Sequence, residues 1–265
     1  MRSTRKLAIK YFITLSLFTL LLTNCKQSQT SPPVNPPPTS TGDSIMAKSY
    51  DDKGLEFYKS GNLDGAISEW EKALVADPGY ADSHYNLGRA LYDQAKYDEA
   101  LGHFQEAVRL VPVASAAWYN LGLTYAALNK MEDAVSAFEM AIQLEPELMD
   151  AYFNLGVANY SLGEYDNAII NLQTVLINRP NDIYALYDLG LALYASGDKT
   201  QAISKWEEAL KLAPNYSEAY YGLGLAFLDQ GDTSKARTAF QKCIDIDPNS
   251  KIASEASRKL DQIGK

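Results

Sequence analysis

One spacing dominates this chain, because proline, glycine and alanine each recur every 34 residues over six cycles. The prolines are Pro78, Pro112, Pro146, Pro180, Pro214 and Pro248. The glycines are Gly54, Gly88, Gly122, Gly156, Gly190 and Gly224, and the alanines are Ala66, Ala100, Ala134, Ala168, Ala202 and Ala236. A fixed period of about 34 residues is typical of stacked helix–turn–helix units. We therefore expect an elongated stack of six units over 47–250, which binds along a surface instead of doing chemistry in a pocket.

Each unit also carries large and small apolar residues at fixed positions. In the unit that begins at Ser115, these positions hold Trp118, Leu121, Gly122, Tyr125, Ala134, Phe138, Ala141 and Pro146. This pattern resembles the tetratricopeptide repeat, and the resemblance recurs six times in register over about three quarters of the chain. It implies an all-α, right-handed α-solenoid. The expected repeats are 47–80, 81–114, 115–148, 149–182, 183–216 and 217–250.

The periodic residues have mechanical roles in such a solenoid. Glycine and alanine allow the two helices of a unit to approach closely, and a large residue fills the space between units. The large residues are Trp70, Phe104, Phe138, Leu172, Trp206 and Phe240. A left-handed turn residue is expected after each first helix, at Gly61, Ala95, Asn129, Gly163, Gly197 and Gly231. Each proline then stops the second helix.

Both ends of the repeat array depart from the pattern in the direction expected for a terminus. The first unit has Lys53 and Glu56 where other units have apolar or small residues. After Pro248, the segment 251–265 places Ile252, Ala256, Leu260 and Ile263 at helical spacing. We expect a single amphipathic helix that caps the solenoid.

The first 24 residues are typical of a secretory signal, with a basic start and an apolar run of 13 residues from Tyr11 to Thr23. The run ends at Asn24 and Cys25 in a pattern that resembles a bacterial lipobox, although Gly, Ala or Ser usually precedes the cysteine. The resemblance implies that Cys25 is lipidated and becomes the first residue of the mature protein. An uncleaved membrane anchor with an incidental cysteine is the alternative.

Residues 25–46 are rich in proline, serine and threonine and predict an extended tether. Lys26 follows the cysteine, and Asp at that place retains many such lipoproteins at the inner membrane. The resemblance thus implies a lipid-anchored protein of the bacterial cell envelope, at the outer membrane if the cell has one.

Net charge argues against binding to nucleic acid. The whole chain carries −9, and four of its 24 cations lie in the first 24 residues. Removing these four leaves 20 cations against 33 anions, a net charge of −13. An acidic surface of this kind repels phosphate backbones.

The resemblance implies that the first helix of each unit lines a concave groove. The residues at the groove positions are rich in tyrosine and asparagine: Tyr58, Tyr85, Asn86, Arg89, Tyr92, Tyr119, Asn120, Phe153, Asn154, Tyr160, Tyr187, Asp188, Tyr194 and Tyr221. Tyrosine is typical of binding hot spots, and asparagine can both donate to and accept from a peptide backbone. We expect these residues to bind an extended polypeptide. A Tyr-Asn-Leu-Gly run is also close to the generic repeat sequence, so packing alone is the alternative.

No set of residues indicates catalysis, a cofactor or a metal site. His84 stands where other units have Trp, Leu or Tyr, which predicts a packing role. His103 and Glu106 share a helix face, but a metal needs three or four ligands. Cys243 occupies the place of a small buried residue. We therefore expect a non-enzymatic protein without a cofactor.

These observations predict a scaffold or adaptor that binds an extended segment of another envelope protein. The alternatives are an assembly factor for a secretion or pilus apparatus, a glycan- or peptidoglycan-binding protein, and a structural spacer without a ligand. The sequence makes no prediction of the partner's identity or of the oligomeric state.

Overall fold

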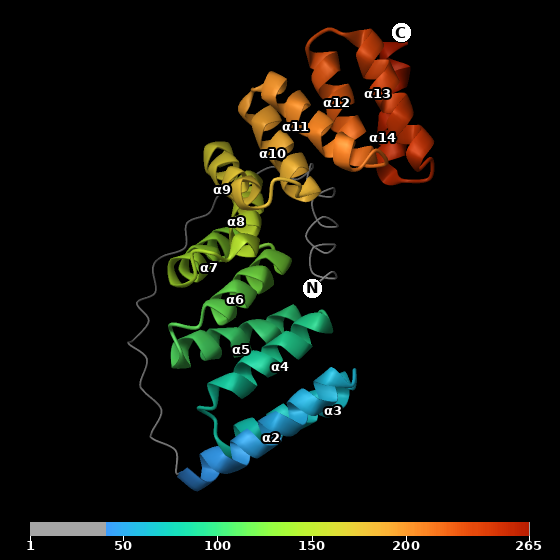
Figure 1. Cartoon of the computed structure of the whole chain (residues 1–265). Coiled ribbons are helices and arrows are strands. Elements are labelled where there is room, and N and C mark those ends of the chain that lie inside the picture. Colours follow the sequence, from blue (N-terminus) through green and yellow to red (C-terminus); the bar gives the residue numbers. More distant parts are fainter. Residues whose placement is uncertain (1–40, 265) are drawn as a thin grey trace, which may run out of the picture.

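The computed structural model describes residues 41–264, which form thirteen α-helices and no strands. The first helices of the six repeats are α2 (Thr41–Lys59), α4 (Ala81–Asp93), α6 (Ser115–Ala127), α8 (Met149–Ser161), α10 (Ile183–Ser196) and α12 (Ser217–Asp229). The second helices are α3 (Leu63–Ala76), α5 (Tyr97–Leu110), α7 (Met131–Leu144), α9 (Tyr165–Asn178), α11 (Lys199–Leu212) and α13 (Thr233–Ile246). They stack in chain order from α2 to α13 (Figure 1). The predicted all-α solenoid is confirmed.

The first helix begins earlier than the sequence predicted. Helix α2 starts at Thr41, so residues 41–46 are helical, whereas the sequence predicts an extended tether there. The last tether proline is Pro38, and beyond it no residue prevents a helix. Asp43 lies in the first turn, where its charge complements the helix dipole. The signal segment 1–24, Cys25 and the tether up to residue 40 lie outside the described residues.

The core of each repeat is a large side chain from the second helix packed against a glycine of the first. Trp206, Phe104, Phe138, Phe240 and Leu172 have no exposed surface, and Trp70 is 1% exposed. A Cβ atom at Gly122 would lie 2.6 Å from the Phe138 ring, and one at Gly224 would lie 2.5 Å from the Phe240 ring. Only glycine fits there, which explains why this residue recurs with the period of the fold.

The turns inside the repeats adopt the left-handed conformation that the sequence predicted. Four of them use glycine, with φ between 77° and 99°. The other two use Ala95 and Asn129, each with φ of 59°. Alanine carries a steric cost in this conformation that glycine does not.

The predicted capping helix is α14 (Lys251–Ile263). Ile252 and Ala256 are buried in the cluster that contains Phe240, and Ala253 is also buried. Helix α14 contacts α13 and α12. At the opposite end of the array, Lys53 and Glu56 are exposed, as expected where no earlier repeat covers the helix.

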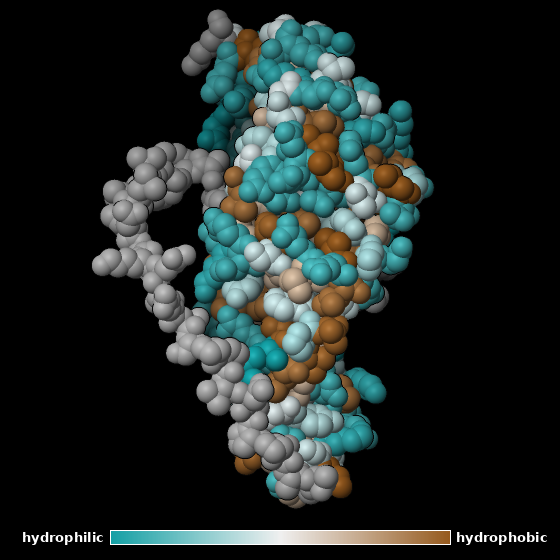
Figure 2. All heavy atoms as spheres, turned by 90° about the vertical axis from the view of Figure 1, so that its left-hand side faces the viewer, coloured by the Kyte–Doolittle hydropathy of each residue, from teal (hydrophilic) through white to brown (hydrophobic). Residues whose placement is uncertain are grey.

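Apolar side chains are not confined to the inside of the stack. Seen from the left-hand side of Figure 1, hydrophobic residues form patches between hydrophilic ones along the molecule (Figure 2). On the second helix α9, Ile170 is 61% exposed and Ile177 is 79% exposed. A binding face therefore has to be identified by its architecture, because hydrophobicity alone does not single one out.

Candidate functional site

The predicted groove residues lie on the first helices, and each first helix contacts the first helix of the next repeat. The stacking thus places the predicted residues of all six repeats on first helices that lie side by side, and we call their shared side the inner face. Their side chains are partly buried, apart from Asn86 and Phe153, which are buried at 8% exposure each. This exposure suits a wall that packs on one side and can receive a ligand on the other.

Hydrogen bonds join residues that are 35 positions apart along this face. Asn86 Nδ2 donates to Asp51 Oδ1 at 3.1 Å, and Asn154 Nδ2 donates to the Tyr119 hydroxyl at 3.2 Å. Asn120 Nδ2 lies 3.4 Å from the Tyr85 hydroxyl in the same relation. Because 35 is one more than the repeat length, each bond ties a first helix to the next. We call this bond the clasp.

The asparagine amides also bond within their own helices. Asn120 Nδ2 donates to the carbonyl of Ala116 and Asn154 Nδ2 to that of Asp150, both at 2.7 Å. The amide donors are therefore engaged inside the groove wall. Sequence reasoning assigned the asparagines to a partner's backbone and missed this structural role. The offset of 35 between tyrosine and asparagine, visible in the sequence, was the available signal.

A second row of bonds with the same offset runs beside the clasp. The Tyr58 hydroxyl donates to Asp93 Oδ2 and the Tyr194 hydroxyl to Asp229 Oδ2, each at 2.7 Å. Lys199 forms an ion pair with Asp229 at 3.1 Å. The Tyr194 bond, followed by Lys199, lowers the pKa of the Asp229 carboxyl. Both aspartates were absent from the predicted site.

Arg89 is the predicted cation of the groove, and it lies among tyrosines. Its guanidinium carbon is 5.1 Å from the centre of the Tyr58 ring and 5.6 Å from that of Tyr85. This is the geometry of a cation–π contact. Its Nη2 is also 3.4 Å from the Tyr58 hydroxyl. The amino-terminal half of the groove therefore supplies its own cation to its tyrosines.

The remaining groove tyrosines pack against second helices. The ring centres are 5.1 Å apart for Tyr92 and Tyr97, and 5.7 Å apart for Tyr160 and Tyr165. Tyr221 lies 5.7 Å from the buried Phe240 ring. These tyrosines hold the repeat together as well as facing the groove.

The clasp is broken in the carboxyl-terminal half. Phe153 stands where a hydroxyl would be needed, and its counterpart 35 positions later is Asp188 instead of asparagine. At the next step the residue 35 positions after Tyr187 is Gly222, which has no side chain. Burial, and to a smaller extent Asp182, raises the pKa of Asp188 to about 7.

Tyr216 lies beside this break, in the turn before α12, and sequence reasoning did not select it. Its hydroxyl is buried and has no hydrogen-bond partner among the described residues. Burial, followed by Asp188, raises its pKa. Its ring centre is 5.0 Å from that of Tyr187. Because the residue lies outside the first helix, the groove pattern did not include it.

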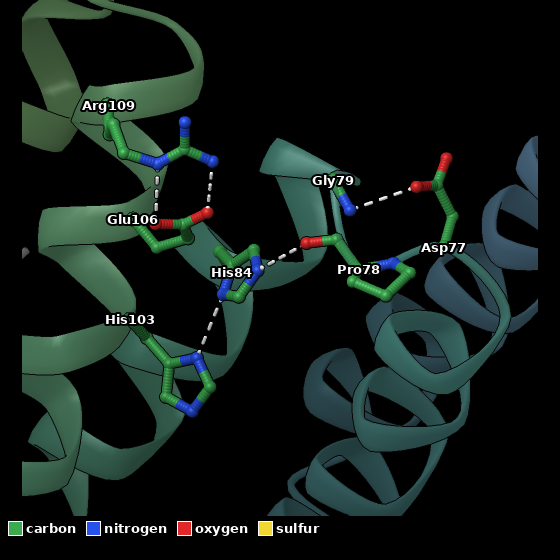
Figure 3. A network of polar contacts seen from close by, with 7 residues as sticks. All are labelled: Asp77, Pro78, Gly79, His84, His103, Glu106 and Arg109. Atoms are coloured by element: carbon green, nitrogen blue, oxygen red, sulfur yellow. Dashed lines mark hydrogen bonds and ion pairs between the residues drawn. The ribbon is translucent and has the colours of Figure 1, made fainter. Parts of the chain in front are cut away.

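The two histidines contact each other in repeat 2 (Figure 3). His84 Nε2 lies 3.0 Å from the carbonyl oxygen of Pro78, and its Nδ1 lies 3.0 Å from His103 Nδ1. The carbonyl can only accept, so in neutral His84 the hydrogen is on Nε2, and His103 donates to Nδ1. Trp118 makes the equivalent bond to Pro112, at 2.8 Å. His84 thus fills a structural position of the repeat.

Glu106, His103 and Cys243, the other residues considered as catalytic or metal-binding candidates, are engaged in contacts within the fold. Glu106 is bonded to Arg109, with 2.8 Å between Oε2 and Nε (Figure 3). Burial and then His84 lower the pKa of His103. Cys243 is fully buried, and burial raises the pKa of its thiol to about 11. Over residues 41–264, no three His, Cys, Asp or Glu side chains are grouped closely enough to hold a metal ion.

The described helices can be compared with what a membrane-spanning helix requires. Between residues 41 and 264, none combines the length and the apolar character needed to cross a bilayer.

Several solved structures share this architecture. YrrB, whose structure is described as a TPR protein with an unusual peptide-binding site, is 25% identical with a TM-score of 0.62, over 71% of this chain and 97% of that chain. The MamA protein is 28% identical with a TM-score of 0.61, over 65% and 94%. PilF of Pseudomonas aeruginosa is 18% identical with a TM-score of 0.65, over 83% and 100%, and shows the fold alone.

A search of curated proteins gave no match. The tetratricopeptide repeat model matches residues 52–112, 85–149, 132–183 and 187–251, which together make up well over half of the chain. With the thirteen helices, the periodic glycine contacts and the left-handed turns, this match places the chain in the tetratricopeptide repeat family.

Proposed function

We propose that this chain is a non-catalytic adaptor of the bacterial cell envelope, which holds an extended segment of another envelope protein in its concave groove. The observation that carries this proposal is the continuous tyrosine-lined inner face, built by the first helices and tied by the clasps. Proteins of the tetratricopeptide repeat family bind peptides or other proteins. A peptide-binding site is described for YrrB, at 25% identity.

An extended segment matches the spacing of the inner face. Packed helices lie about 8–10 Å apart, and an extended chain advances about 3.3 Å per residue. About three partner residues therefore pass over each repeat. The rigid tyrosine rings supply contact area at a low cost in side-chain entropy.

The orientation of the tyrosine rings favours a peptide over a sugar. Tyr85, Tyr119 and Tyr221 meet the core phenylalanines at 63°, 50° and 55°. Such rings pack against the core of their own repeat and are held within the wall. This geometry supports the adaptor function more than a glycan-binding one.

The cellular placement is proposed from the amino-terminal sequence. We infer that residues 1–24 are removed, that Cys25 is lipidated and that the proline-rich segment holds the groove away from the membrane. The residue after the cysteine, Lys26, favours the outer membrane where one is present. The acidic charge disfavours nucleic acid as the partner.

Replacing Cys25→Ser should move the protein out of the membrane fraction, and continued retention would contradict lipidation.

Photo-crosslinking in intact cells tests whether the groove is the binding face. A photoreactive residue at Leu123 or Val157, which hold in repeats 3 and 4 the groove position that Arg89 holds in repeat 2, should capture a partner peptide that mass spectrometry can identify. The control is Ile177, which is exposed on the second helix α9. If Ile177 captures the same partner as efficiently, or if neither groove position captures one, the groove is not the site.

A further inference from the structure

We propose that the carboxyl-terminal half of the groove binds a lysine or arginine side chain of the partner segment, with Asp188 and Glu218 as the acceptors. This inference rests on the proposed adaptor function and specifies the chemistry of the partner. Three features of the described residues support it: the charge of this half of the groove, the break in the clasp, and a buried hydroxyl without a partner.

The charges of this half are all negative. The inner-face positions of repeats 4 to 6 contain four acidic residues and no lysine or arginine: Asp150, Asp188, Glu218 and Asp229. Asp150 forms an ion pair with Arg179 at 2.6 Å, and Asp229 forms one with Lys199. Within residues 41–264, neither Asp188 nor Glu218 forms an ion pair. Two carboxylates therefore remain for a cation that the partner would supply.

The two carboxylates influence the same place on the inner face. Asp188 and Glu218 both contribute, after burial, to raising the pKa of Tyr187 and of Tyr216. Among the described residues, the Glu218 carboxylate accepts a side-chain hydrogen bond only from the Ser217 hydroxyl, at 3.0 Å. A partner's cation on this part of the inner face would thus meet acidic groups that form no ion pair within residues 41–264.

The repeats provide an internal comparison for the break in the clasp. Where the sequence has tyrosine followed 35 positions later by asparagine, as at Tyr119 and Asn154, the two side chains satisfy each other. At the following step, Phe153 cannot bond to Asp188, and Gly222 leaves the next position empty of a side chain. The hydrogen-bonding groups that the other repeats pair with each other through the clasp are therefore available to a ligand beside Tyr187.

The tyrosines around the break are suited to a cation. The buried Tyr216 hydroxyl lacks a partner among the described residues and is an uncompensated polar group beside the Tyr187 ring. In repeat 2 of the same groove, Arg89 lies over two tyrosine rings. The equivalent position in repeats 5 and 6 is occupied by Leu191 and Leu225. A partner's cation would occupy here the kind of site that Arg89 occupies there.

A panel of peptides tests the inference directly. Random 12-residue peptides displayed on phage are selected on the full chain in detergent and on three variants. The first variant carries Asp188→Asn with Glu218→Gln. The second carries Phe153→Tyr with Asp188→Asn, which rebuilds the pair seen at Tyr119 and Asn154. The control carries Asp166→Asn with Glu207→Gln, the same charge change at exposed positions of second helices.

The wild-type chain and the control should enrich peptides with lysine or arginine at one fixed position. Replacing that residue with norleucine should weaken binding by at least about tenfold, as for other buried charge pairs. Both groove variants should lose this preference, and melting curves establish that they are folded. Enrichment without a basic residue, or an unchanged preference in the folded variants, would overturn the inference.

The same selection separates this inference from the proposed function. A fourth variant, Leu123→Gln with Val157→Gln, is added for this purpose, and its melting curve establishes that it is folded. Peptides that bind the wild-type chain and lose binding on this folded variant, but that carry no basic residue, would support the adaptor function and refute the lysine or arginine site. If no peptide is enriched on any form of the chain, the proposed function fails and this inference fails with it.

Discussion

At the scale of single residues, the backbone turns show where the repeat pattern is followed imperfectly. Six equivalent turns need a left-handed residue, and Ala95 is the one alanine among them, with φ of 59°. Gly102 is the opposite case, because it is exposed in the middle of α5 and a Cβ there would meet nothing within 4 Å. Both residues belong to repeat 2, so their effects can be compared in one environment.

We expect Ala95→Gly and Gly102→Ala to stabilise the protein by about 0.5–1 kcal/mol each. The first removes the steric cost of a left-handed alanine, and the second removes the entropic cost of a helical glycine. The reverse substitutions at equivalent kinds of position, Gly163→Ala in a left-handed turn and Ala137→Gly in a helix, should destabilise the protein. Urea unfolding followed by circular dichroism measures all four. A loss of stability with Ala95→Gly would contradict this account of the turn.

Asp188 should make the stability depend on pH. Burial raises its pKa in the folded protein to about 7, above the ordinary value of 3.8. The folded state therefore binds the proton more tightly, so the favourable contribution is complete below about pH 4 and is lost as the pH rises through 7. Asp188→Asn should raise the melting temperature at pH 8 and change it little at pH 4.

The magnitude at pH 8 should be roughly 1–3 kcal/mol, because one pKa unit corresponds to about 1.4 kcal/mol and solvent screening removes part of the effect. Scanning calorimetry at the two pH values measures it, and Asp166→Asn provides the exposed control. An equal effect of Asp188→Asn at both pH values would show that the cost of the buried charge is not the cause.

At the scale of elements, the clasp is the feature that joins one first helix to the next. The groove positions stay a prediction from the resemblance, which assigns them directly. It did not predict that Asn120 and Asn154 would bond to tyrosines of the preceding repeat. That contact depends on the twist and rise between repeats, which a period of 34 does not specify. The break at Phe153 and Asp188 becomes meaningful only once the clasp is known.

A double-mutant cycle on Tyr119 and Asn154 measures the clasp. Tyr119→Phe and Asn154→Ala should each destabilise the protein by about 0.5–1.5 kcal/mol, the usual net value of an intramolecular hydrogen bond. The double variant should lose less than the two effects added together, because either change alone breaks the bond. The same cycle on Tyr187 and Asn154, which are not joined, serves as the control. Full additivity for Tyr119 and Asn154 would show that the bond contributes nothing.

At the scale of the whole molecule, the 34-residue period predicted the architecture, but it did not predict where the first helix begins. The six repeats and the capping helix followed from residues such as Pro248 and Ile252, whose spacing is a direct consequence of the fold. The start of the first helix did not follow, because residues 41–46 carry no periodic signal and resemble the tether in composition. Tyr216 was missed for a related reason, since a residue in a turn has no place in a helical pattern.

A solenoid without a central core should respond to damage locally, and removal of the capping helix tests this expectation. Helix α14 covers Phe240 and Cys243 with Ile252 and Ala256. A chain that ends at residue 250 would expose this cluster, so repeat 6 should lose protection against amide hydrogen exchange. Each repeat contacts only its neighbours, and repeats 1 to 4 should therefore keep their protection.

A milder variant gives the control for this truncation. Ile252→Ala keeps α14 but removes part of its buried surface, and it should reduce protection in repeat 6 by a smaller amount. Mass spectrometry resolves the exchange repeat by repeat. Loss of protection in α4 or α6 after truncation would mean that the six repeats unfold as a single unit, and the groove could then not retain its amino-terminal half when its carboxyl-terminal half opens.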